Sequence, residues 1–262
     1  MTGLEKLYDF MKQYKVDRMT QNGQTITYTH SMLHEPYGAY DIPDNAHSEF
    51  INLYVDAIVT GHIPHIMEKH KECGPIVIDL DFKYSKGYDS RYYTTDTINE
   101  IIKIYNSVIS DVLNVSETFM DAYVLEKKNP DCKRSCYRDG LHIIYPYICT
   151  GPSTQILMRD KFNSLAIERK IFAELPLEND IDTIFDKHSI CNTGQMMYGS
   201  RKNPLCSTYY VTHHYKIENG EMSHTVNDID IADKKNTMVY VNLLSCRRFN
   251  LSLNDGLYFA KK

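Results

Sequence analysis

The segment Gly74-Pro75-Ile76-Val77-Ile78-Asp79-Leu80-Asp81-Phe82 is the most informative stretch of this 262-residue chain. Its apolar, β-branched run predicts a buried strand over residues 76–82 that carries two carboxylates near its end. Because side chains alternate along a strand, Asp79 and Asp81 are expected on one face, roughly 6.5 Å apart, with the apolar residues facing the core. Like charges that close repel each other, and a hard cation such as Mg²⁺ or Mn²⁺ would relieve the repulsion. The segment therefore predicts a core strand with a metal site on one face.

The composition is that of an ordinary globular protein. Hydrophobic residues make up 42% of the chain and charged residues 24%, and the formal net charge is −5. No apolar run approaches the roughly 20 residues that a membrane span requires, and the first turns lack the apolar core of a signal peptide. We therefore expect an intracellular protein without a membrane partner.

The cysteines do not predict a disulfide framework, because there are seven of them at irregular spacings. Cys132 and Cys136, followed by His142, hint at zinc. This spacing is poor for a structural zinc site and no fourth ligand is evident. Zinc is therefore not expected.

Helices and strands alternate along the chain without a strict βαβ rhythm, which favours an α+β fold. Helical spacing covers residues 97–113, and residues 48–70 predict one or two helices with a break at Gly61 and Pro64. Strands are expected over residues 24–30, 122–126, 140–148, 195–199, 208–214 and 237–244. The chain is expected to form a single domain over 1–262, with an N-terminal α/β unit over about 1–75 and a motif-bearing core over about 76–250.

A second motif is the strand Arg138-Asp139-Gly140-Leu141-His142-Ile143-Ile144. Alternation places Gly140 and His142 on one face, and Leu141 and Ile143 on the other. Glycine lets a ligand approach the backbone closely, and an imidazole beside it could hold a phosphate. For a single histidine on a strand, a purely structural role is the simpler interpretation.

A third motif is Ile184-Phe185-Asp186, in which an acid follows an apolar pair. Asn192 and the segment Tyr198-Gly199-Ser200-Arg201-Lys202 come after it. On its own, Asp186 would be interpreted as a helix cap or a surface acid.

In this order, the three motifs resemble those of the archaeo-eukaryotic primase superfamily: a two-acid strand, a small-x-His strand and a third acid. The chain is similar in more detail to the primase domain of primase-helicases from nucleocytoplasmic large DNA viruses of the poxvirus type. That likeness covers residues 25 to 250 and includes Thr29 to Pro43, Val124 to Lys127, Tyr198 to Lys202 and Leu243 to Arg247. It departs from the pattern at Gly140, where many primases have serine, and at Met196-Met197, where cellular relatives place an arginine.

The resemblance implies an α+β primase core with an RRM-like antiparallel sheet, which joins nucleotides from NTP or dNTP into primers on a single-stranded DNA template. Two Mg²⁺ or Mn²⁺ ions would be held by Asp79, Asp81 and Asp186. The implied nucleotide-binding residues are Arg138, Gly140, His142, Asn192, Arg201 and Lys202. Weaker candidates for template contacts are Lys127, Lys133, Arg134 and Arg247.

No Gly-x4-Gly-Lys-Ser/Thr loop occurs in the chain, so an ATP-driven helicase domain is not expected within it. The resemblance to primase-helicases implies such a domain in the same polypeptide when it is intact. The resemblance implies a viral protein that acts in the host cytoplasm or nucleus. One alternative is a catalytically weak module that binds single-stranded DNA and loads a replicative helicase. A more remote alternative is a glycosyltransferase, in which an Asp-x-Asp motif holds the metal of a nucleotide-sugar donor.

Overall fold

The computed structural model describes residues 1–17, 28–69, 72–85, 87, 90–132, 136–191, 194–227 and 230–247. Over these ranges the fold is α+β with antiparallel sheets, as expected. The chain forms two compact units. Unit 1 comprises 1–71, 194–209 and 228–248, and unit 2 comprises 72–193, 210–227 and 249–262. Within the described residues, no helix is long and apolar enough to cross a membrane.

Unit 1 combines a five-stranded sheet, in the order β1-β3-β2-β4-β9, with three helices. Its elements are α1 (Gly3–Lys12), β1 (Lys15–Val16), β2 (His30–Met32), β3 (Gly38–Tyr40), α2 (Asp44–Val59), β4 (Ile66–Glu68), β9 (Gln195–Met196) and α7 (Lys234–Leu243). Helix α1 begins with a capping box between Thr2 and Glu5, and buries Leu7, Phe10 and Met11.

The division into units differs from the expected boundary near residue 75. Strand β9 pairs with β4, and α7 contacts α2, so two late segments complete the N-terminal unit. Backbone packing explains the first of these joins: a Cβ on Gly194 would lie 2.3 Å from the carbonyl oxygen of Glu68, so only glycine permits this approach. The expected core over 76–250 is thus shared between the two units.

Two expected elements have a different structure. The end of the segment 48–70, expected as a helix, forms strand β4, because it pairs with β2 on one side and with β9 on the other. The expected strand over 237–244 is helix α7, whose N-cap Asp233 accepts from the backbone N–H groups of Lys235 and Asn236. Most of the strand expected over 24–30 lies outside the described residues.

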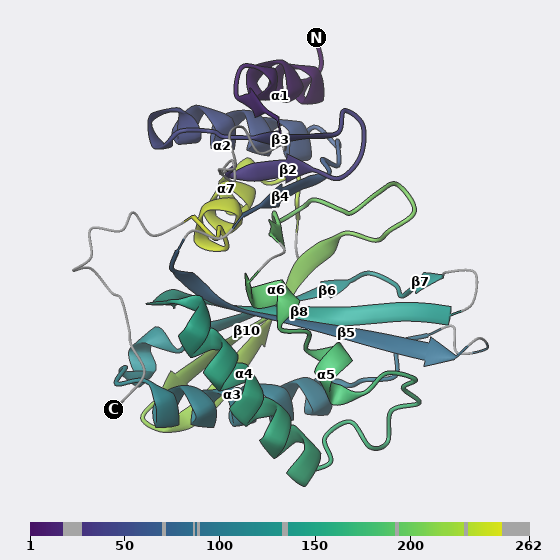
Figure 1. The fold of residues 1–262 in the computed structure, drawn as a ribbon, viewed down its shortest axis with the longest axis vertical. Coiled ribbons are helices and arrows are strands. Elements are labelled where there is room, and N and C mark those ends of the chain that lie inside the picture. Colours follow the sequence, from purple (N-terminus) through teal and green to yellow (C-terminus); the bar gives the residue numbers. More distant parts are fainter. Residues whose placement is uncertain are drawn as a thin grey trace. The chain divides into compact units, whose positions relative to one another are not determined.

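Unit 2 is built on a large antiparallel sheet in the order β11-β10-β6-β8-β5, with β7 paired to β8. Its elements are β5 (Gly74–Ser85), α3 (Thr95–Val112), the 3-10 turn η1 (Glu117–Phe119), β6 (Ala122–Lys127), β7 (Asp131–Cys132), β8 (Cys136–Thr150), α4 (Pro152–Glu168), α5 (Ile181–Ile184), α6 (His188–Cys191), β10 (Tyr209–Glu218) and β11 (Glu221–Val226). Helices α3 and α4 lie together on one side of this sheet (Figure 1).

The core of unit 2 lies between the sheet and these two helices. Strand β5 contributes alternate residues from Ile76 to Tyr84, and α3 contributes the apolar stripe that runs from Ile98 to Val112. The faces of β5 therefore divide as its sequence predicts. Every second side chain is buried in the core, which leaves Asp79 and Asp81 on the opposite face of the sheet.

Candidate functional site

The candidate site lies on the face of the unit 2 sheet opposite its helices, where β5 and β8 run side by side. Their antiparallel register pairs Asp79 with His142 and Asp81 with Gly140. The Nε2 atom of His142 lies 3.3 Å from Oδ1 of Asp79. The two motifs, which are distant in sequence, therefore lie side by side on one face of the sheet. The prediction that Asp79 and Asp81 share a face, and that Gly140 and His142 share a face, is confirmed.

The two carboxylates differ in their surroundings. Asp79 is half-buried, whereas Asp81 is exposed. Desolvation beside the sheet, and then the negative charge of Asp79, raise the pKa of Asp81 above its ordinary value. The side chains of Lys127, His142 and Arg138 oppose this rise. The pair is therefore a concentration of negative charge in which each carboxylate repels the other, and such a pair suits a cation.

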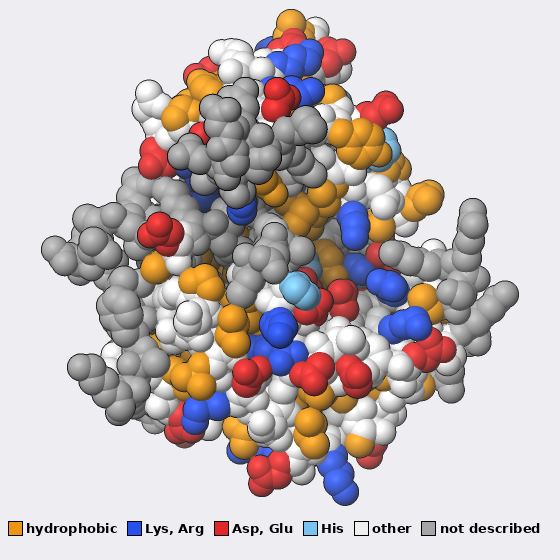
Figure 2. Space-filling model, in the orientation of Figure 1, with side chains coloured by type: hydrophobic (Ala, Val, Ile, Leu, Met, Phe, Trp, Pro, Cys, Tyr) orange, Lys and Arg blue, Asp and Glu red, His pale blue; other side chains and the backbone are white. Residues whose placement is uncertain are grey.

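Basic side chains surround the pair. Arg138 is exposed on β8 and lies opposite Lys83 on β5. Lys127 of β6 is buried and forms an ion pair with Asp131 at 3.0 Å. In Figure 2, acidic, basic and histidine side chains gather over the part of unit 2 where β5, β8 and α6 lie in Figure 1. Carboxylates for a cation thus lie next to cationic groups that suit a phosphate.

The third predicted acid, Asp186, lies between the short helices α5 and α6 and is exposed. Its Oδ1 accepts from the backbone N–H of His188 at 3.0 Å, so the side chain caps the start of α6. Both α5 and α6 contact β5. Within the described ranges, however, no three His, Cys, Asp or Glu side chains lie close enough together to hold a metal ion. The shared metal role of Asp186 stays a prediction.

The remaining predicted residues are spread over the chain. Arg201 and Lys202 belong to unit 1, where the segment before them is fixed by the hydroxyl of Ser200, which lies 2.9 Å from the Tyr54 hydroxyl. Lys202 is exposed and Arg201 is half-buried. Three further predicted site residues lie outside the described residues: Lys133, Arg134 and Asn192.

The placement of Arg247 argues against the template contact predicted for it. This residue is only 5% exposed. Its guanidinium donates to the carbonyl of Ile42 at 3.1 Å and to the carboxylate of Asp44 at 2.6 Å. Arg247 therefore ties the end of α7 to the start of α2 within unit 1.

The sequence did not single out a buried charge network on the helix-covered face of the sheet. Arg91 donates to Asp139 at 2.9 Å, to Glu126 at 2.8 Å and to the carbonyl of Lys127 at 2.5 Å. The carboxylate of Asp139 also accepts from the N–H of Gly140. This network ties β6 to β8 at the level of the site. Asp139 was visible within the His142 motif, but nothing in the sequence indicated that Arg91 is its partner.

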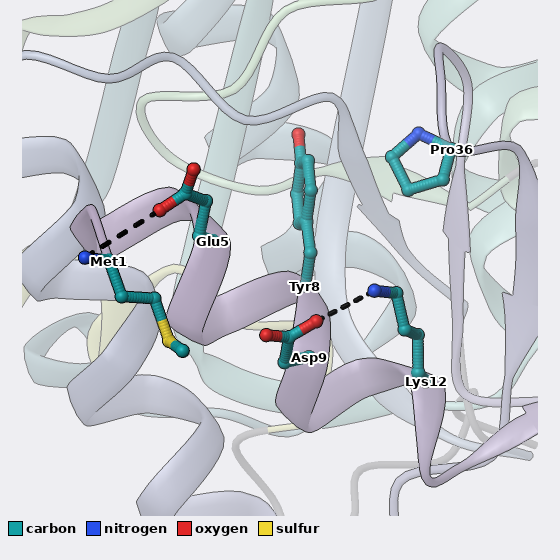
Figure 3. Close-up of a pocket in the computed structure, with 6 residues that line it drawn as sticks. All are labelled: Met1, Glu5, Tyr8, Asp9, Lys12 and Pro36. Atoms are coloured by element: carbon teal, nitrogen blue, oxygen red, sulfur yellow. Dashed lines mark hydrogen bonds and ion pairs between the residues drawn. The ribbon is translucent and has the colours of Figure 1, made fainter.

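A pocket of about 590 Å³ lies on α1 in unit 1 (Figure 3). It is lined by Met1, Glu5, Tyr8, Asp9, Lys12 and Pro36. Its charged groups pair with one another, Lys12 with Asp9 at 2.7 Å and the amino terminus with Glu5 at 3.9 Å. No predicted site residue lines it, so we assign it no part in the chemistry.

Comparison with known proteins identifies the class to which this fold and site belong. The family described as the C962R protein N-terminal AEP domain matches residues 29–215, a range that includes all three acidic and histidine motifs. The chain therefore belongs to this family, which is part of the archaeo-eukaryotic primase superfamily.

Two viral relatives are similar over most of the chain. The helicase-named protein L207/L206 of Acanthamoeba polyphaga mimivirus is 46% identical over 252 residues, covering 96% of this chain and 26% of the relative. The helicase-named protein 184R of Invertebrate iridescent virus 6 is 23% identical over 207 residues, covering 71% of this chain and 21% of the relative. The chain thus spans about a quarter of the length of these relatives.

Proposed function

We propose that this chain is the catalytic domain of a template-dependent DNA primase, which transfers nucleotides from NTP or dNTP to start primers in viral DNA replication. The observation that carries the proposal is the register of β5 and β8, which sets Asp79 and Asp81 opposite His142 and Gly140 on one face of the sheet. Membership of the primase superfamily supports the same assignment.

The carboxylate pair fits Mg²⁺ or Mn²⁺. Such ions are commonly bound in proteins by one or two carboxylates together with water and substrate phosphates. Asp79 and Asp81 supply this set, and the raised pKa of Asp81 reflects desolvation and a repulsion that a cation would remove. Asp186 is the proposed third ligand. Two bound ions would supply activation of the 3′-hydroxyl and stabilisation of the pyrophosphate leaving group.

The basic groups around the pair are proposed to bind the triphosphate. Arg138 is exposed on β8, and its guanidinium carries a planar fork of donors that is well suited to an incoming phosphate. His142 would donate from the same face. Lys127, held by Asp131, would add positive charge without leaving its place. Asn192, Arg201 and Lys202 are proposed as further nucleotide or template contacts.

Single-stranded DNA is the proposed template, bound mainly through its backbone and therefore with strong salt dependence. The relatives are helicase-named and about four times as long as this chain, so we infer that a helicase region follows in the same polypeptide. The proposed site of action is the host cytoplasm or nucleus during viral replication.

A second candidate function is a weakly active module that binds single-stranded DNA and loads the helicase. The observation that favours it is the lack, within the described part of the chain, of three ligands gathered around a metal position. This candidate retains the basic surface but does not need the acid pair.

Primer synthesis on a single-stranded template, with Mg²⁺ or Mn²⁺ and labelled nucleotides, tests the proposal. Asp79→Asn and Asp81→Asn are expected to lower incorporation on the order of a thousandfold, because each removes charge from the proposed metal site. Asp111→Asn, a change of the same type at an exposed position on α3, is the matched control. Near wild-type synthesis by either site variant would refute the proposal. A wild type that binds DNA but makes no primers would favour the loading module.

A further inference from the structure

The segment before Asp186 is fastened to the edge of strand β5. Leu177 forms a single bridge with Tyr84, and the N–H of Glu178 donates to the carbonyl of Lys83 at 2.8 Å. The side chain of Asn179 then continues the pairing, since its Nδ2 donates to the carbonyl of Asp81 at 2.8 Å and its Oδ1 accepts from the N–H of Lys83 at 3.0 Å. One amide side chain thus takes the place of a neighbouring strand beside Asp81.

A buried arginine fastens the same segment at its other end. Arg159 of α4 is 7% exposed, and its Nε donates to the carbonyl of Phe185 at 2.7 Å. Its Nη2 donates to the carbonyl of Asp182 at 3.0 Å and to the Asp182 carboxylate at 2.9 Å. Phe185 directly precedes Asp186, so this guanidinium holds the backbone one residue away from the third acid.

The contacts of Arg159 and Asn179 matter because helices α5 and α6, on either side of Asp186, are too short to be stable on their own. Helices α5 and α6 have four residues each, far below the length at which an isolated helix is stable. The carbonyls of Asp182 and Phe185 lie at the end of α5, where no further helical turn supplies donors. A cationic group at a helix C-terminus satisfies such carbonyls and is also favoured by the helix dipole.

We propose that Arg159 and Asn179 are positioning residues that fix Asp186 relative to the Asp79–Asp81 pair. Asn179 ties the segment to the backbone of Asp81, and Arg159 ties it to the core through α4. The inference rests on the proposed function, because the position of Asp186 matters to metal binding only if Asp186 is a ligand. Neither residue is expected to touch the nucleotide.

Two conservative variants of the full chain test this inference. In Arg159→Lys the single ammonium lacks the planar fork that reaches two carbonyls at once. In Asn179→Asp the donor that faces the Asp81 carbonyl is replaced by an acceptor of the same shape. Arg169→Lys, at the exposed end of α4, and Asn114→Asp, at an exposed loop position, are the matched controls.

The first readout is hydrogen exchange of the amides in residues 181–191, and the second is Mn²⁺ binding followed by the electron paramagnetic resonance signal of the free ion. Both site variants are expected to exchange faster in this segment and to bind Mn²⁺ about tenfold more weakly, while both controls match the wild type. In primer synthesis, kcat is expected to fall about tenfold and KM for the nucleotide to stay unchanged, because misplacement of a reacting group by about 1 Å can cost a hundredfold.

Unchanged exchange in both variants would overturn the anchoring. Faster exchange with unchanged Mn²⁺ binding would overturn the positioning of a ligand and leave a purely structural role. A wild type that binds no Mn²⁺ would also overturn the inference. Failure of the proposed function looks different: Mn²⁺ binding would respond to the variants as expected, but neither the wild type nor any variant would synthesise primers.

Discussion

Two carboxylates, one in each unit, show opposite electrostatic behaviour. Glu68 of β4 is only 2% exposed, and its two oxygens accept from the hydroxyl of Ser245 at 2.8 and 2.9 Å and from the N–H of Cys246 at 2.8 Å. Burial alone would raise the pKa of Glu68, but His30 and these donors lower it below its ordinary value. For Asp81, which is exposed, desolvation and the charge of Asp79 raise the pKa instead.

The difference distinguishes a carboxylate that stabilises the fold from one that is available for function. Glu68 is buried but fully supplied with donors, so its charge is compensated inside the protein. Asp81 is close to solvent but lies beside a like charge, and the protein does not neutralise it completely. A satisfied acid points to a structural role, whereas a pair of carboxylates that repel each other is typical of a functional site.

The largest expected effect is on Glu68. Glu68→Gln removes the charge and turns a donor group toward Ser245 or Cys246, so we expect the free energy of unfolding to fall by about 3 kcal/mol. Urea denaturation at neutral pH measures the free energy of unfolding. The control is Glu49→Gln, a change of the same type at an exposed position on α2. A loss no larger than that of the control would show that the hydrogen bonds of Glu68 contribute little.

The same variant has a predicted pH dependence. Because the folded pKa of Glu68 lies below its ordinary value of 4.5, its stabilisation is present above that value and is lost as the pH falls through the lower, folded pKa. The difference in unfolding free energy between wild type and Glu68→Gln should therefore narrow below pH 4.5. If the difference in unfolding free energy between the two proteins stays constant down to the pH at which acid unfolds them, this explanation is wrong.

In unit 2, His142→Gln tests whether the imidazole acts on a substrate. We expect KM for the nucleotide to rise about tenfold, which corresponds to the loss of one charge-assisted hydrogen bond to phosphate, with a smaller change in kcat. Steady-state primer synthesis measures both constants. An unchanged KM would return His142 to a structural role beside Asp79.

Cation binding should stabilise unit 2 through the acid pair. At a Mn²⁺ concentration ten times its Kd, linkage predicts about 1.4 kcal/mol of stabilisation and a rise in Tm of about 3 °C. Asp79→Asn should abolish most of this rise, and thermal denaturation with and without the ion measures it. An equal rise in the variant would place the ion elsewhere.

The smallest expected effect is a gain in stability. Since the folded pKa of Asp81 is raised, its ionisation costs stability as the pH rises through that pKa, and Asp81→Asn should raise Tm by about 2 °C at pH 7. Solvent screening keeps the effect small. The gain should disappear as the pH falls toward the ordinary aspartate value of 3.8. A variant less stable than the wild type at pH 7 would mean that Asp81 is already compensated.

The sequence predicted the division of faces in the acid-bearing part of β5, where buried Ile78, Leu80 and Phe82 alternate with the more exposed Asp79 and Asp81. Strand β8 is instead buried on both faces from Asp139 to Pro146. Alternation predicted which residues of each strand share a face, but the pairing of β5 with β8 and its register are known only from the structure. The sequence could not predict that β9 and α7 complete unit 1, since pairing across more than 120 positions leaves no local pattern.

The misassigned elements show the same limit. The β-branched residues in 237–244 favour a strand, but the cap at Asp233 and the packing of α7 on α2 favour a helix. Arg247 was selected for its charge, although its side chain is buried against Ile42 and Asp44. The sequence did not single out Arg159 or Asn179, because the contacts that fix the segment are largely to backbone carbonyl and amide groups, which any sequence supplies.

The pairing of Glu68 with Ser245 has a consequence for the timing of synthesis. The two residues are 177 positions apart, and ribosomes add about 5–20 residues per second, so roughly 9–35 s pass between their appearance. During that interval Glu68 has His30 as a partner but lacks the hydroxyl of Ser245 and the N–H of Cys246. The hydrogen bonding of Glu68 can therefore be completed only after Ser245 and Cys246, which follow α7, have been synthesised.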